Sequence, residues 1–98
     1  MKKDSTFDII IKALDSLQTS IMTSECTINE KDTLSALVTS LKNYYEKKLK
    51  YLSMLRRSNK IIELNTFVTD IIVEINEVLM RKGDVTYHAS LIYKKINK

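Results

Sequence analysis

The sequence IIELNTFVTDIIVEINEVLMRK, residues 61–82, has the apolar spacing of a long amphipathic helix. Apolar residues recur at alternating steps of three and four, which places them on one side of a helix because each residue turns it by about 100°. They are Ile61, Leu64, Phe67, Val68, Ile71, Ile72, Ile75, Val78 and Leu79. The stripe covers an arc of roughly 140°, wide enough to face a hydrophobic core. We expect a helix over residues 60–82, around which the rest of the chain packs.

A second, thinner apolar line runs along the opposite, mostly polar side of this helix. It consists of Ile62, Val73 and Met80. A helix that buries one side only does not need such a line, so we expect a second neighbour there. Either a short C-terminal helix covers it, or a second copy of the chain does, in an isologous homodimer.

The composition predicts one all-α domain over residues 1–98. A chain of 98 residues with 44% hydrophobic residues can form one core, and it has no proline and a single glycine, Gly83, for the turns that strands need. The only cysteine, Cys26, cannot form an internal disulfide. No apolar run reaches 18 residues, and Lys12 and Asp15 interrupt the N-terminal aliphatic stretch. We therefore expect neither a spanning helix nor a signal peptide, and a cytoplasmic location.

Two further long helices are expected before residue 60. Residues 5–23 and 30–57 both have helical apolar spacing, and a polar loop separates them. The apolar stripe of the second helix consists of Leu34, Leu37, Val38, Leu41, Tyr44, Tyr45, Leu49, Leu52 and Leu55. Asn29 with Asp32 has the spacing of a capping box and would open the second helix. Nothing breaks residues 30–57, so at 1.5 Å per residue that helix is about 42 Å long, against roughly 30 Å for the first. One end should overhang, unless the helix bends near Asn43.

The remaining segments complete an antiparallel bundle of three long helices and a short C-terminal one. Ser58–Lys60 is the expected turn, and so short a connection makes the flanking helices antiparallel. The sequence of residues 85–96 fits a helix or a strand. A lone strand would have no partner, so we favour a short helix.

Charge is concentrated in the middle of the chain. Residues 42–60 sum to +6 and residues 61–80 to −4. The basic residues are Lys42, Lys47, Lys48, Lys50, Arg56, Arg57 and Lys60. We favour a solvated face that pairs with the acidic third helix over a nucleic-acid site, because these cations point in several directions around the helix. The alternative is a small nucleic-acid-binding or phage/plasmid regulatory protein that uses the basic face of residues 42–60. Membrane contact is disfavoured, since the apolar stripe is needed for the core.

No catalytic or metal-binding motif is apparent. One histidine and one cysteine lie far apart, and a single glycine cannot form a phosphate loop, so we expect no metal, no cofactor, no small-molecule substrate and no enzymatic activity. Arg81 and His88 resemble the Arg-x4–6-His signature of HEPN-type ribonucleases. Gly83 and Asp84 fall between them, where we expect a helix end, so a capping arginine and a surface histidine are the favoured interpretation.

The C-terminal 40 residues carry a family resemblance. The turn Ser58–Ile62, the helical segment Asp70–Val78 and the tail from Gly83 resemble the immunity proteins of class IIa (enterocin-A-type) bacteriocins. That family is typically four antiparallel helices with a break between the second and third, whereas residues 30–57 here contain no breaker. The resemblance implies a cytoplasmic, non-enzymatic protein that protects the producing cell from a pore-forming peptide. It would act at the membrane receptor complex and not on free peptide.

The resemblance also places specificity in the C-terminal segment. The partner-binding residues that it implies are Tyr87, His88, Leu91, Tyr93, Lys94 and Lys95.

Overall fold

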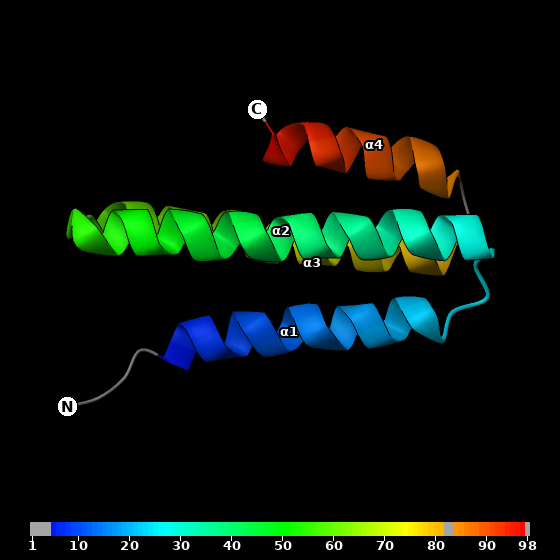
Figure 1. The fold of residues 1–98 in the computed structure, drawn as a ribbon, viewed down its shortest axis with the longest axis horizontal. Coiled ribbons are helices and arrows are strands. Elements are labelled where there is room, and N and C mark those ends of the chain that lie inside the picture. Colours follow the sequence, from blue (N-terminus) through cyan, green and yellow to red (C-terminus); the bar gives the residue numbers. More distant parts are fainter. Residues whose placement is uncertain (1–4, 82–83, 98) are drawn as a thin grey trace.

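Four helices make up the part of the chain that the computed structural model describes, residues 5–81 and 84–97. They are α1 (Ser5–Met22), α2 (Ile28–Met54), α3 (Ser58–Arg81) and α4 (Val85–Ile96). Successive helices run antiparallel (Figure 1). The predicted all-α bundle of three long helices and a short C-terminal one is confirmed, and α2 is one continuous helix.

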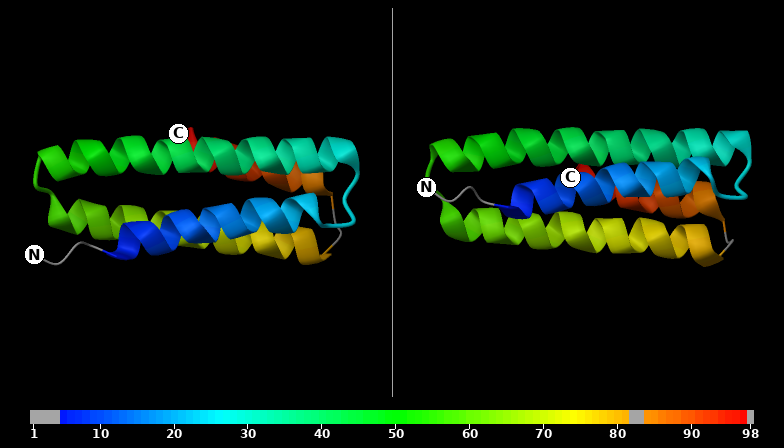
Figure 2. Two further views of the ribbon diagram at one scale, coloured as in Figure 1. Left: turned by 60° about the horizontal axis from the view of Figure 1, so that its bottom comes forward. Right: turned by 90° about the horizontal axis from the view of Figure 1, so that it is seen from below.

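The helices α2 and α3 form the centre of the bundle, and α1 and α4 flank them on opposite sides (Figures 1 and 2). Both α1 and α4 contact α2 and α3, while in the described residues the backbones of α1 and α4 do not come close to each other. The predicted stripe of α3 lies in the resulting core. Its fully or almost fully buried members are Leu64, Val68, Ile71, Ile72, Ile75 and Val78. Burial of each such side chain stabilises the fold by roughly 1.5–3 kcal/mol.

One buried tyrosine joins three helices. Tyr45 of α2 is completely buried, its ring stacks on Phe7 of α1 with centroids 5.8 Å apart, and its hydroxyl donates a hydrogen bond to Asn65 Oδ1 of α3 at 2.8 Å. A buried hydroxyl is costly unless it is hydrogen-bonded, so this contact fixes how α2 and α3 sit against each other.

The start of α2 differs from the prediction. Thr27 is the N-cap, and its side chain accepts a hydrogen bond from the Glu30 amide at 3.1 Å. The Glu30 side chain in turn accepts a hydrogen bond from the Thr27 amide at 2.9 Å. The capping box at Asn29 and Asp32 was therefore wrong by two residues, because both of these positions already lie inside the helix.

The turn between α2 and α3 also lies earlier than predicted. Residues 55–57 form it, and Ser58–Lys60 is the first turn of α3. Arg56 adopts a left-handed conformation with φ 55°. Its amide donates to the Ser53 carbonyl at 3.1 Å and the Arg57 amide to the Leu52 carbonyl at 3.0 Å. These are the two hydrogen bonds of a Schellman motif, with arginine where glycine is usual.

The thin apolar line of α3 is not covered by α4. Ile62, Val73 and Met80 are all exposed, whereas α4 packs on the other side of α3 and on α2. The expectation that the C-terminal helix covers this line is therefore wrong, and the homodimer stays a prediction. The predicted glycine cap at Gly83 lies outside the described residues.

Candidate interaction surfaces

The short helix α4 is held by four aliphatic residues and one ion pair. Its buried residues are Val85, Ala89, Ile92 and Ile96. The Asp84 side chain caps the helix by accepting a hydrogen bond from the Tyr87 amide at 3.1 Å. Lys95 Nζ lies 3.0 and 2.9 Å from the two carboxylate oxygens of Glu74 on α3. This arrangement leaves the rest of the α4 surface in solvent.

All six predicted partner-binding residues are exposed, but they do not form one patch. Tyr87, Leu91 and Lys94 follow steps of four and three, so they form one outward line. His88 and Lys95 lie on the α3 side, where they line a hollow between α3 and α4, and Leu91 at the edge of the outward line reaches the same hollow. Tyr93 lies on the α2 side, where it lines a different hollow with Ser40. Three of the six predicted residues therefore form one line, and the other three lie on two different sides of α4.

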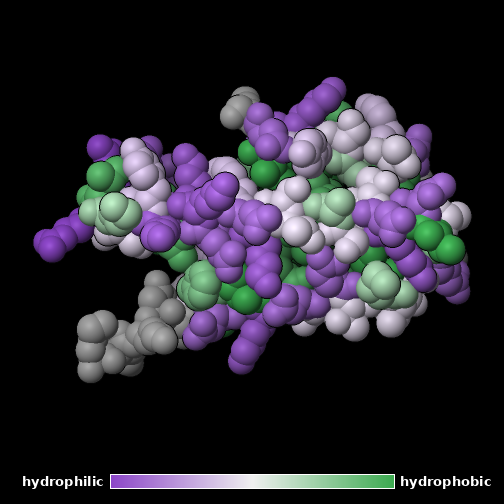
Figure 3. Space-filling model, viewed as in Figure 1, coloured by the Kyte–Doolittle hydropathy of each residue, from purple (hydrophilic) through white to green (hydrophobic). Residues whose placement is uncertain are grey.

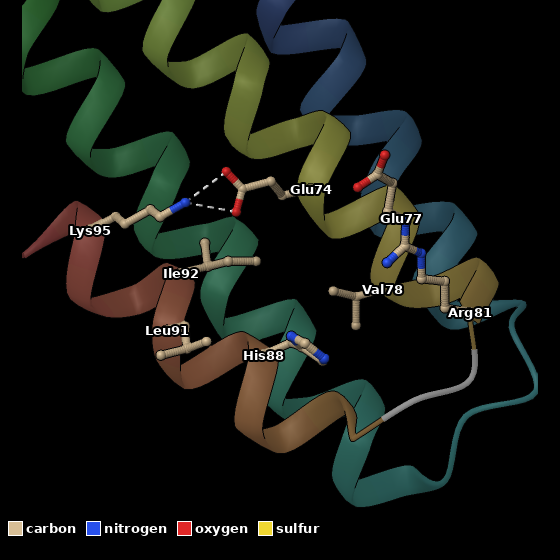
Figure 4. Close-up of a pocket in the computed structure, with 8 residues that line it drawn as sticks. All are labelled: Glu74, Glu77, Val78, Arg81, His88, Leu91, Ile92 and Lys95. Atoms are coloured by element: carbon tan, nitrogen blue, oxygen red, sulfur yellow. Dashed lines mark hydrogen bonds and ion pairs between the residues drawn. The ribbon is translucent and has the colours of Figure 1, made fainter.

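The hollow between α3 and α4 has a volume of about 240 Å³. Figure 4 shows Val78, Leu91 and Ile92 among its lining residues, together with charged side chains from both helices. The charged or titratable lining residues are Glu74, Glu77, Arg81, His88 and Lys95. The site thus combines apolar walls with groups of both signs.

Arg81 and His88, the pair that resembles a ribonuclease signature, line this same hollow (Figure 4). Arg81 is the last residue of α3 and His88 lies in the first turn of α4, with the Asp84 cap between them. The histidine ring makes an edge contact with the neighbouring Tyr87, with centroids 5.4 Å apart. The two residues therefore lie on different helices, and a helix end separates them as the sequence predicted.

The predicted basic face separates into two parts. Lys42 faces α1, where its Nζ lies 3.5 Å from Asp15 Oδ1. Lys47, Lys50, Arg56 and Arg57 lie at the far end of the α2–α3 hairpin and are all exposed.

The expected charge pairing between α2 and α3 is not formed. Across residues 5–81 and 84–97, no ion pair joins these basic residues of α2 and the turn to the carboxylates of α3. Glu74 of α3 pairs with Lys95 of α4 instead. The basic segment is therefore a solvated face, as predicted, but among the described residues its predicted pairing with α3 is limited to Lys60, itself on α3, whose Nζ lies 3.5 Å from Glu63.

The described residues contain no group of three or more potential metal-ligating side chains, and none of their helices is both long and apolar enough to cross a bilayer. Comparison of the chain with protein families, characterised proteins and solved structures finds no match.

Proposed function

We propose that the protein is a non-enzymatic interaction protein of the bacteriocin-immunity type, and that the outward face of α4 contacts its protein partner at the membrane receptor complex. The observation that carries this proposal is the outward line of α4. Tyr87 and Leu91 are 57% and 40% exposed on a helix of only 12 residues. Lys94 extends the same line.

The chemistry of this line suits protein recognition. Exposed tyrosine offers a large, rigid contact surface with a polar tip, and tyrosine is enriched among the residues that dominate binding energy at interfaces. A basic residue beside two apolar ones favours a partner with an apolar groove and an acidic rim. The four antiparallel helices match the number that the family resemblance implies, while the continuous α2 (Ile28–Met54) keeps the departure from the family that the sequence indicated.

Survival of a sensitive strain is the direct test. The protein is expressed inside a bacteriocin-sensitive bacterium, which is then challenged with a panel of class IIa peptides. We expect protection against at least one peptide, and its loss in the double variant Tyr87→Ala/Leu91→Ala. Ile9→Ala is the control, because Ile9 is a similarly exposed apolar residue on α1, far from this line in the sequence. Sensitivity to every peptide at normal expression, or equal loss in the control, would refute the proposal.

Ribonuclease activity is the second candidate, because Arg81 and His88 line one hollow. An imidazole can transfer protons during RNA cleavage, and a guanidinium can hold the phosphate. RNA cleavage by the purified protein that disappears in both His88→Ala and Arg81→Ala would support it. Activity that persists in either variant would point to a contaminating nuclease.

A further inference from the structure

The end of the α2–α3 hairpin is the most charged part of the molecule. We call residues 47–60 the hairpin end. They include six basic residues and no acidic one, so this segment carries +6 while the whole chain carries +4, which leaves −2 for the other 84 residues. The six are Lys47, Lys48, Lys50, Arg56, Arg57 and Lys60. The positive charge of the protein is therefore concentrated at one end of the bundle.

Neighbouring carboxylates leave most of this charge unpaired. Among the residues that the structure describes, Lys60 is the only one of the six that forms an ion pair, with Glu63 at 3.5 Å. Both side chains of that pair are more than half exposed, so water screens their attraction. The positive field of the hairpin end is thus directed outward, towards solvent or a partner.

Large apolar side chains are exposed among these cations. Tyr51, Met54 and Leu55 are 57%, 74% and 48% exposed. Helix α2 has 27 residues and α4 only 12, which at 1.5 Å per residue is about 40 Å against 18 Å, so α4 covers less than half of α2. Figure 1 shows α4 ending well before the hairpin end. This end of the predicted apolar stripe of α2 therefore lacks the cover of α4.

The apolar and basic residues form one patch. Tyr51 and Leu55 are four residues apart, and so are Lys50 and Met54, while Lys47 precedes Tyr51 by four. Residues at this spacing are neighbours on a helix surface. In Figure 3 hydrophobic atoms lie between hydrophilic ones at the same end of the molecule, on the left. Cations and apolar side chains thus face a partner together.

We propose that the hairpin end docks on an anionic lipid bilayer, with Tyr51, Met54 and Leu55 in the headgroup region and the surrounding cations against lipid phosphates. Peripheral membrane binding needs apolar side chains that enter the interface and basic ones that attract anionic lipid, and this patch has both. Tyrosine is enriched at that depth of a bilayer because its ring is amphipathic. The sequence disfavoured membrane contact because the apolar stripe was assigned to the core, and the exposure of Leu55, the last residue of that stripe, removes that reason at the hairpin end.

A nucleic acid fits the patch less well. Its phosphates would pair with the cations, but Met54 and Leu55 would then lie against a charged backbone with nothing apolar to contact. The inference rests on the surface of the hairpin end alone and holds whether or not the protein confers immunity.

The absence of tryptophan from the chain allows a site-specific fluorescence test. Tyr51→Trp places the only tryptophan in the patch, and Tyr87→Trp places it on α4, where the replaced tyrosine is equally exposed, at 57%. Each full-length variant is mixed with vesicles of phosphatidylcholine, with or without phosphatidylglycerol. We expect the Tyr51→Trp emission to shift to shorter wavelength and to resist acrylamide only with phosphatidylglycerol. The Tyr87→Trp emission should stay unchanged. An equal response of both variants, or none in either, would overturn the inference.

A charge reversal tests the electrostatic part. Lys50→Glu should weaken vesicle partitioning roughly thirtyfold, because it replaces one attraction to the anionic surface by a repulsion. Lys12→Glu changes the net charge by the same amount at an exposed position of α1 and should have little effect on vesicle partitioning. Partitioning should also fall as salt is raised.

Two results of these binding measurements, made with vesicles and with duplex DNA, would overturn the inference. One is equal weakening of partitioning by both reversals. The other is tight binding of duplex DNA without vesicle uptake. Vesicle binding and survival are separate measurements on the same variant, Lys50→Glu. Failure of the membrane inference appears in the first measurement and failure of the proposed function in the second.

Discussion

Removing one hydroxyl group tests the contact that joins α2 to α3. Tyr45→Phe keeps the buried ring and its stacking on Phe7, but deletes the 2.8 Å hydrogen bond to Asn65. A hydrogen bond of this kind contributes about 1 kcal/mol, and the loss is moderated because Asn65 is only half-buried and can turn to water. We expect a loss of about 1 kcal/mol in the free energy of unfolding, or a melting temperature lower by roughly 4–8 °C for a domain of this size.

The control is the neighbouring tyrosine. Tyr44 is partly buried against Phe67, with ring centroids 5.8 Å apart, and its hydroxyl forms no hydrogen bond with any residue in the described ranges 5–81 and 84–97. Tyr44→Phe should therefore change stability by less than about 0.5 kcal/mol. Urea unfolding followed by helical circular dichroism measures both variants, and the denaturant slope should stay constant.

A double-mutant cycle completes this test. If the Asn65 contact is the cause, Tyr45→Phe should cost less when Asn65 is already alanine. The same loss of stability in both backgrounds, or equal losses for the two tyrosine variants, would refute the reasoning.

Further predictions concern the caps, the core and the surface. Thr27→Ala removes the capping box of α2 and should destabilise the protein by about 1 kcal/mol in urea unfolding. Arg56→Gly relieves the left-handed backbone and should raise the melting temperature, with a gain of up to about 1 kcal/mol; no gain would mean that arginine adopts this conformation without cost. Ile75→Ala opens a cavity at a fully buried position and should cost about 2–5 kcal/mol, enough to lower the urea midpoint markedly. Lys95→Ala breaks an exposed pair with Glu74 and should cost less than about 1 kcal/mol; a larger loss would show that α4 depends on this pair.

The sequence predicts the helices better than their ends. The three-four spacing from Leu64 to Val78 identifies the buried face of α3, because that periodicity is a direct consequence of helix geometry. The start of α2 is harder to locate, since Thr27 with Glu30 and Asn29 with Asp32 both have capping spacing. The choice depends on which residue adopts the extended backbone, and Thr27 does, with φ −65° and ψ 165°.

Exposure is decided by how the helices are assembled, so the sequence alone predicts it poorly. Ile62 and Met80 have the spacing of a buried line, yet α4 packs against a different side of α3. Leu55 belongs to the apolar stripe of α2, yet it is about half exposed because α4 is too short to reach it. The difference in length between the first and second helices was visible in the sequence and indicated an overhang, but not that α4 would leave the end of α2 uncovered.

The attachment of α4 has a consequence for how recognition can diversify. Four small or aliphatic side chains, spaced as Val85, Ala89, Ile92 and Ile96, hold this helix in place, and every other described position on it is exposed. Exposed helix positions away from caps tolerate substitution at little cost in stability. Under the function proposed above, new target preferences would arise by exchanging residues on this one short helix while the remaining bundle is inherited unchanged.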